Sequence, residues 1–140
     1  MTMRRMSELV RDQDPVMMPP TTTVRRACER MRSRGVGAVL VTKKDRQLVG
    51  IFTGRDAVGR VLAEGRDAGK TTLAEVMTAE PYTMGPKNTA IEALRMMQDR
   101  GFRHIPVVDD DRVLGVVSRG DFRGLEQDRL EEETALWERI

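Results

Sequence analysis

The sequence predicts an α+β fold of two tandem repeats, each with the element order β-α-β-β-α, packed sheet to sheet with pseudo-two-fold symmetry and followed by a C-terminal helical tail. Two observations support this prediction: an ordered internal repeat, and short apolar runs typical of strands that alternate with amphipathic helical segments. The chain has 140 residues, of which 39% are hydrophobic. One half is too short to bury a stable core alone, so we expect the repeats to pack together.

The internal repeat is seen when the sequence is laid over itself with Pro15 on Pro81. Prolines, helix-ending glycines, strand valines and an aspartate then coincide: Pro20 with Pro86, Gly35 with Gly101, Val41 with Val107 and, after one deleted loop residue, Asp56 with Asp121. The sequence therefore predicts a tandem duplication. Repeat 1 is expected over residues 7–68, repeat 2 over residues 73–124, and the helical tail over residues 125–140.

Each repeat is expected to begin with a short extended segment around a proline, at residues 15–18 and 81–84. A helix follows, because apolar residues recur at helical spacing in both repeats. Thr23 and Thr89 precede these helices, and a threonine hydroxyl at that position accepts a hydrogen bond from a free backbone N–H group. Glycine tolerates the left-handed conformation that ends a helix, and it follows the first helix at Gly35.

A β-hairpin is predicted after each of these helices. Its strands are two short apolar runs on either side of a polar turn, which is the usual pattern of a hairpin. A second helix is expected to start after the hydroxyl residue that ends the hairpin. The segments are residues 38–41 and 48–52 before Thr53 in repeat 1, and residues 105–108 and 113–117 before Ser118 in repeat 2.

Cysteine and histidine each occur once, which excludes a disulfide framework and a structural zinc site. Cys28 lies at helical spacing with Val24 and Met31, so we expect a buried, inert thiol; a reactive thiol activated by neighbouring arginines is the alternative. The longest apolar run is far shorter than the ~20 residues that span a bilayer. No apolar segment follows the basic N-terminus, so a secretory signal is not expected. We therefore expect a cytoplasmic protein with no membrane partner.

The net charge is +2, but the first half of the chain is basic and the second half is acidic. A basic surface can bind nucleic acid. Three Phe, one Tyr and one Trp leave too few aromatic side chains for a base-stacking platform, so nucleic acid is not expected as a partner. A solvated helix face, or charge complementarity between subunits, explains the basic residues equally well.

A polar motif ends each hairpin, with the sequence GIFTGRD at residues 50–56 and GVVSRGD at residues 115–121. In one interpretation, the hydroxyl and the aspartate three residues later form a capping box. In the other, the aspartate also accepts hydrogen bonds from a ribose diol, while a phosphate meets the helix start and the adjacent Arg55 or Arg119. The spacing alone leaves both interpretations open.

The chain resembles a tandem pair of cystathionine β-synthase (CBS) domains of the stand-alone bacterial type. The resemblance rests on the two GxxxxxD motifs, on residues 101–109 (GFRHIPVVD), and on the lead-in segments 14–18 and 77–81. It covers residues 7–124. It implies a regulatory signal-transduction module that binds an adenosine-containing ligand (ATP, ADP, AMP, S-adenosylmethionine or NAD) in the clefts between the repeats and passes this signal to a partner protein.

The resemblance also implies which residues line each cleft. The first cleft joins the ribose motif of repeat 1 to the lead-in and first hairpin strand of repeat 2: Thr53, Arg55, Asp56, Thr83, Phe102, Arg103, His104 and Pro106. The second joins the motif of repeat 2 to repeat 1: Ser118, Arg119, Asp121, Met17, Gly37, Ala38 and Val39. Gly37-Ala38 replaces Arg103-His104 here, so the second cleft keeps its ribose motif but lacks the nearby charges. For His104, a structural role is as plausible as a phosphate contact.

A sensor of adenine nucleotides is the function that these observations favour. The alternative is a nucleotide-independent structural dimer with degenerate clefts. An enzyme is not expected, because no nucleophile, base or metal cluster accompanies the aspartates, so no catalytic cofactor or metal is predicted. We expect a homodimer that regulates an unidentified protein in trans. In the tail, Leu125, Leu130 and Trp137 lie among glutamates and predict an amphipathic helix that packs on the module or in the dimer.

Overall fold

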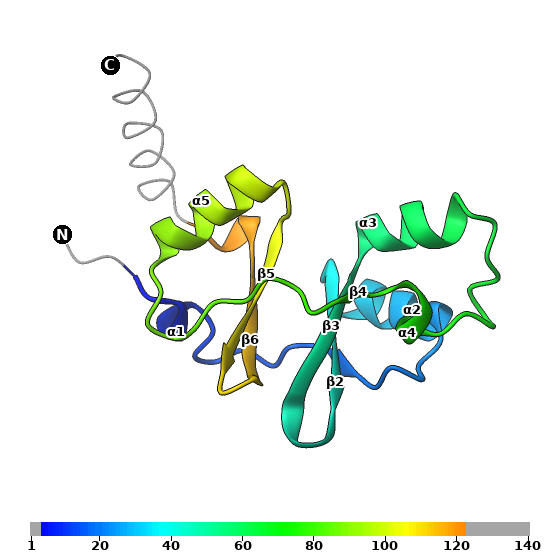
Figure 1. Ribbon diagram of the computed structural model, residues 1–140, viewed down its shortest axis with the longest axis horizontal. Helices are drawn as coiled ribbons and strands as arrows, with labels where there is room; N and C mark the ends of the chain where they lie inside the picture. The colour runs from blue at the N-terminus through cyan, green and yellow to red at the C-terminus, as the bar shows by residue number, and fades with distance from the viewer. Residues whose placement is uncertain (1–3, 123–140) are drawn as a thin grey trace, which may run out of the picture. The chain divides into compact units, whose positions relative to one another are not determined.

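The computed structural model describes residues 4–122, drawn in colour in Figure 1, and this part of the chain forms two compact units. The repeat-1 unit contains Asp14–Tyr82 and Asp110–Val113. The repeat-2 unit contains, within the described residues, 4–13, 83–109 and 114–122. Both units combine helices with strands, which confirms the α+β class. The predicted tail lies outside the described residues.

The repeat-1 unit follows the predicted order of elements. The elements are β1 (Met17–Met18), α2 (Val24–Arg34), β2 (Ala38–Lys43), the 3-10 turn η1 (Lys44–Arg46), β3 (Gln47–Thr53), α3 (Gly54–Asp56), η2 (Ala57–Leu62), α4 (Leu73–Val76) and β4 (Thr78–Ala79). β2 and β3 form the antiparallel hairpin, with Leu40 opposite Ile51. β1 pairs in parallel with β2, and β4 pairs antiparallel with β3, where Gly50 lies opposite Ala79.

The repeat-1 core lies between the hairpin and the helices. Val39 and Phe52, from β2 and β3, are completely buried. They belong to one apolar cluster with Ala27 of α2, Val61 of η2 and Leu73 of α4. The segment that follows the GIFTGRD motif, η2 and α4, is therefore part of the same core as the hairpin. The position of Asp56 therefore depends on the packing of α4 as well as on β3.

The two long helices begin and end where the sequence predicts. The Thr23 hydroxyl accepts a hydrogen bond from the Arg26 N–H at 3.3 Å, and α2 ends at Gly35, whose φ of 63° is left-handed. Thr89 forms a reciprocal capping box with Glu92 at the start of α5 (Ala90–Arg100). Each helix thus has a local sequence signal at both ends.

The helix after Thr53 differs in type from an ordinary α-helix. α3 continues directly into η2, a π-helix over Ala57–Leu62. Its wider turns show in the hydrogen bond from the Ala63 N–H to the Val58 carbonyl at 2.9 Å, which spans five residues. Sequence periodicity predicts a helix here but does not distinguish this wider form.

The repeat-2 unit has a similar hairpin and helix. Its elements are α1 (Met6–Leu9), α5 (Ala90–Arg100), β5 (His104–Asp109), β6 (Arg112–Ser118) and the 3-10 turn η3 (Arg119–Asp121). β5 and β6 are neighbours in the sheet, and the expected extended segment near Pro81 forms a single parallel bridge between Met84 and Val107. The hairpin turn and the first two residues of β6 (Asp110–Val113) belong to the repeat-1 unit, where the Leu48 N–H donates to the Asp111 carbonyl.

The N-terminal segment packs in the repeat-2 unit, although the sequence analysis grouped residues 7–13 with repeat 1. Met6 and Val10 are buried in the same core as Leu94. The Gln13 side-chain amide bonds to both backbone groups of Val116, each at 2.7 Å, and so replaces a strand along β6. Residues 73–79 have the corresponding place beside β3 in the repeat-1 unit. The hairpin of repeat 2 is therefore covered by the segment that precedes the lead-in of repeat 1, and the hairpin of repeat 1 by the segment that precedes the lead-in of repeat 2.

Two glycines permit these close approaches. A Cβ atom on Gly115 would lie 2.6 Å from Cβ of Val10, and one on Gly50 would lie against the sulfur of Met77. Both positions are the first residue of a GxxxxxD motif. The glycine of each motif is thus explained by the segment that packs against its strand, at Met77 for Gly50 and at Val10 for Gly115.

Candidate functional site

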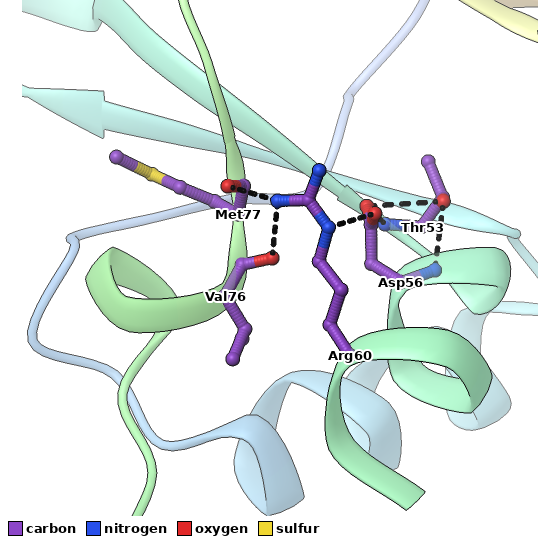
Figure 2. Close-up of polar contacts among 5 residues, drawn as sticks. All are labelled: Thr53, Asp56, Arg60, Val76 and Met77. Carbon is purple, nitrogen blue, oxygen red and sulfur yellow. Dashed lines mark hydrogen bonds and ion pairs between the residues drawn. The ribbon is translucent and has the colours of Figure 1, made fainter. Parts of the chain in front are cut away.

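Thr53 and Asp56 form a closed pair at the end of β3 (Figure 2). Oδ2 of Asp56 accepts hydrogen bonds from the Thr53 N–H at 2.9 Å and from the Thr53 hydroxyl at 3.2 Å. The Asp56 N–H in turn donates to Oγ1 of Thr53 at 3.4 Å. This is the capping box that one interpretation of the motif predicts, and it holds a buried carboxylate in a fixed position.

The second oxygen of Asp56 faces a residue that the sequence analysis did not single out. Nε of Arg60, in η2, lies 3.5 Å from Oδ1 of Asp56. Nη1 of the same guanidinium donates to the carbonyl of Met77 at 2.9 Å and to that of Val76 at 3.3 Å (Figure 2). An arginine four residues after an aspartate on a helix is a recognisable ion-pair spacing, so the contact with Asp56 has a sequence signal. The contact with Val76 and Met77 has none.

Four predicted residues of the second cleft belong to the repeat-1 unit, in the lead-in and at the start of the hairpin. Gly37 lies beside the motif of its own repeat, because the Gly54 N–H donates to its carbonyl at 3.2 Å. Ala38 pairs with Thr53, and Val39 pairs with Phe52. Val39 is completely buried, whereas Met17 is half-buried.

Ser118 and Asp121 repeat the hydroxyl–carboxylate pair at the end of β6. Oδ2 of Asp121 accepts from the Ser118 N–H at 2.7 Å and from the Ser118 hydroxyl at 3.3 Å. The carboxylate is exposed, in contrast to the buried Asp56. Nη2 of Arg4 donates to the backbone carbonyl of Asp121 at 3.2 Å, whereas Arg60 faces the carboxylate of Asp56. The same motif therefore has different surroundings in the two units.

Arg103 and His104 lie beside the Ser118 motif of their own repeat. The Arg119 N–H donates to the Arg103 carbonyl at 3.0 Å. Burial lowers the pKa of His104, the carboxylate of Asp121 raises it, and the guanidinium of Arg103 lowers it, with a net downward shift. Because desolvation disfavours the charged imidazolium, His104 is largely neutral near pH 7. In this form it is a hydrogen-bonding group rather than a cation for a phosphate.

The remaining predicted residues of the repeat-2 unit surround its first strand. Pro106 is buried in β5, and its carbonyl accepts from the Met84 N–H at 3.0 Å. Thr83 is exposed immediately before that contact, and Phe102 is half-buried against the repeat-2 core. Each unit thus brings its own lead-in, strand and motif together. The assignment of Thr83 and Arg103 to the same ligand as Asp56 stays a prediction.

The single cysteine lies away from these motifs, on α2. Cys28 is half-buried rather than fully buried, and burial raises the pKa of its thiol. A raised pKa lowers the fraction of reactive thiolate, which favours the expected inert thiol over the alternative of an activated one. Within residues 4–122, histidine, cysteine and carboxylate side chains form no group suited to a metal ion, and no helix is long and apolar enough to cross a membrane.

A comparison with known families identifies the class of protein. The model of the CBS domain matches residues 6–63 and 73–127, which is more than half of the chain. The chain therefore belongs to the CBS domain family and contains two CBS repeats.

Relatives of this chain include plant and bacterial proteins. The CBS domain-containing protein CBSCBSPB1 of Arabidopsis thaliana is 38% identical over 100 residues, which are 71% of this chain but 18% of that protein. The CBS domain-containing protein YhcV of Bacillus subtilis is 34% identical over 102 residues, 73% of this chain and 71% of that protein. The chain thus spans less than a fifth of the length of the plant protein.

Solved structures of CBS proteins share the fold. The CBS domain protein PAE2072 from Pyrobaculum aerophilum, complexed with AMP, matches with a TM-score of 0.81 at 26% identity, over 91% of this chain and 98% of that one. The CBS-domain containing protein ATU1752 from Agrobacterium tumefaciens matches with a TM-score of 0.76 at 28% identity, over 84% and 94%.

Proposed function

We propose that this protein is a regulatory module that binds an adenosine-containing nucleotide (AMP, ADP, ATP, S-adenosylmethionine or NAD) through the ribose motifs at Asp56 and Asp121. The observation that carries the proposal is the repeated pair: a hydroxyl and a carboxylate in the same geometry at the end of equivalent strands. In each pair Oδ2 is used by the cap. The carboxylate is therefore oriented in advance, and its other oxygen can accept ribose hydroxyls.

The AMP complex of the Pyrobaculum relative supports this choice of ligand. We infer that the protein is not an enzyme and that nucleotide occupancy changes how it binds a partner protein in trans. We also infer that it acts as a homodimer in the cytoplasm.

Calorimetric titration of AMP, ADP, ATP, S-adenosylmethionine, NAD and GTP into the purified chain tests the proposal. We expect at least one adenine ligand to bind and GTP to bind more weakly. Asp56→Asn and Asp121→Asn are each expected to abolish binding at one motif while the protein stays folded, because the amide removes the charge that strengthens the ribose hydrogen bonds. Binding of no adenine ligand by the wild-type chain would favour the nucleotide-independent structural dimer.

A matched control comes from another capping box of the same chain. Thr89 and Glu92 make the same reciprocal contacts at the start of α5, at 3.1–3.3 Å, without a GxxxxxD motif. Glu92→Gln removes a carboxylate from an equivalent helix cap. It is expected to leave nucleotide affinity unchanged. Equal losses in Glu92→Gln and Asp56→Asn would mean that the titration reports helix stability rather than ribose contact.

A further inference from the structure

Arg60 joins the candidate ribose carboxylate to a distant part of the repeat-1 backbone. Its Nε lies 3.5 Å from Oδ1 of Asp56, and its Nη1 donates to the carbonyls of Val76 and Met77 (Figure 2). These carbonyls mark the junction between α4 and β4. One guanidinium, about half exposed, is therefore shared between the ribose motif and this junction.

The two oxygens of Asp56 differ in their capacity for a ligand. Each carboxylate oxygen accepts about two hydrogen bonds. Oδ2 already accepts two from Thr53. A ribose diol, which offers two hydroxyl donors, is left with Oδ1. When both hydroxyls bind there, the acceptor sites of Oδ1 are filled and Nε of Arg60 loses its partner.

We propose that ribose hydroxyls and Arg60 compete for Oδ1 of Asp56, so that nucleotide binding weakens the contact of Arg60 with this carboxylate and loosens the α4–β4 junction. This inference rests on the proposed function and adds to it the route by which occupancy of the repeat-1 motif changes the backbone. Competition is reciprocal: the factor by which a bound nucleotide weakens the Arg60 contact equals the factor by which the intact contact weakens nucleotide binding.

The junction is well placed to respond. The Met77 N–H donates to the Leu73 carbonyl at 2.8 Å, and the Glu80 N–H donates to the Val49 carbonyl at 3.3 Å. These hydrogen bonds lie on either side of β4, which pairs with the strand that carries Thr53. Loss of the guanidinium from the carbonyls of Val76 and Met77 removes a link between η2 and this segment. Amide exchange at residues 77 and 80 therefore reports the release.

Within the described residues, this arrangement is present in repeat 1. In the sequence, the position that corresponds to Arg60 in repeat 2 is Leu125, which has no group to compete for a carboxylate. The experiment can thus be confined to one motif by using Asp121→Asn as the background. Arg66 supplies a matched control, because its Nη1 bonds Oε2 of Glu75 at 3.2 Å and so links the segment after η2 to α4.

The test measures AMP affinity by calorimetry in the full-length Asp121→Asn chain, with and without Arg60→Gln or Arg66→Gln. Arg60→Gln is expected to bind AMP about 1.5- to twofold more tightly, because the ion pair that it removes is half exposed and therefore weak. Arg66→Gln, which makes the same change in net charge, is expected to leave affinity unchanged. Hydrogen exchange at Met77 and Glu80 is expected to become faster when AMP binds to the chain with Arg60, and to be fast with or without AMP after Arg60→Gln.

The outcomes separate this inference from the proposed function. Equal or weaker AMP binding by Arg60→Gln overturns the competition and leaves the nucleotide function intact. Tighter binding in both arginine variants also overturns it, because the effect then comes from net charge. A chain that binds no AMP, nor any other adenine ligand of the titration series, overturns the proposed function, and the competition with it.

Discussion

Replacement of the two motif aspartates by alanine should destabilise the protein unequally. Both carboxylates accept from a backbone N–H and a hydroxyl, at 2.9 and 3.2 Å for Asp56 and at 2.7 and 3.3 Å for Asp121. Asp56 is buried, so Asp56→Ala leaves the Thr53 donors in surroundings that water reaches poorly. Asp121 is exposed, so water can replace its oxygen after Asp121→Ala.

The magnitudes follow from these environments. A buried donor left without a partner costs ~1–3 kcal/mol, and an exposed helix cap costs nearer ~0.5–1 kcal/mol. The ion pair with Arg60 adds only a few tenths of a kcal/mol, roughly, because the guanidinium is half exposed. We therefore expect the free energy of unfolding to fall by about 1–2.5 kcal/mol in Asp56→Ala and by about 0.5–1 kcal/mol in Asp121→Ala.

Urea denaturation followed by far-UV circular dichroism measures both values. The dependence of the unfolding free energy on urea concentration should have the same slope in both variants and the wild-type protein, so that their unfolding midpoints can be compared directly. Thr53→Val is a useful companion, since it removes the hydroxyl but keeps the β-branched shape. Asp121→Ala costing as much as Asp56→Ala, or more, would refute the reasoning from burial.

Three further predictions use other parts of the two units. Gly50→Ala and Gly115→Ala should each destabilise the fold by ~1–3 kcal/mol in urea denaturation, because a Cβ atom would clash with Met77 at Gly50 and with Val10 at Gly115, whereas Gly59→Ala has open space and should not. The pKa of His104 is lowered in the folded protein, so as the pH falls the unfolded chain is protonated first and the free energy of unfolding decreases below about pH 6.5. His104→Gln should therefore reduce the loss of stability between pH 7.5 and 5.5. An equal loss in both proteins would contradict the assignment. Cys28 has a raised pKa and should react with a thiol reagent at pH 7.5 more slowly than a small free thiol, with a rate at or above the free thiol counting against it.

Local features of this fold were predictable from the sequence because their causes lie within a few residues. Thr23 and Thr89 each cap a helix by accepting from the backbone N–H three residues ahead, and Gly35 ends a helix through its own left-handed φ. The hairpins follow from short apolar runs around polar turns. The capping box at Thr53 and Asp56 was likewise predictable, since the two residues are close neighbours along the chain.

Contacts between distant segments were not predictable in the same way. The expected bounds of repeat 1 include residues 7–13 because the family resemblance begins there, and in the structure Val10 and Gln13 pack on β6. Nothing local identifies that partner; the only trace is Gly115, whose missing side chain makes room. The hydrogen bond from Arg60 to Met77 could not be predicted either, because its acceptor is a backbone carbonyl, which every residue type has.

The two repeats therefore share the hydroxyl–carboxylate pair but differ in the groups that surround it. Asp56 is buried beside an arginine that also binds the backbone of the following segment. Asp121 is exposed and lies near His104, which is neutral at pH 7 because burial lowers its pKa. If both carboxylates bind ribose as proposed, Asp56 must exchange its contact with Arg60 for the ligand, whereas Asp121 exchanges water. The two motifs should then differ in affinity, and only binding at Asp56 should alter the backbone at Val76 and Met77.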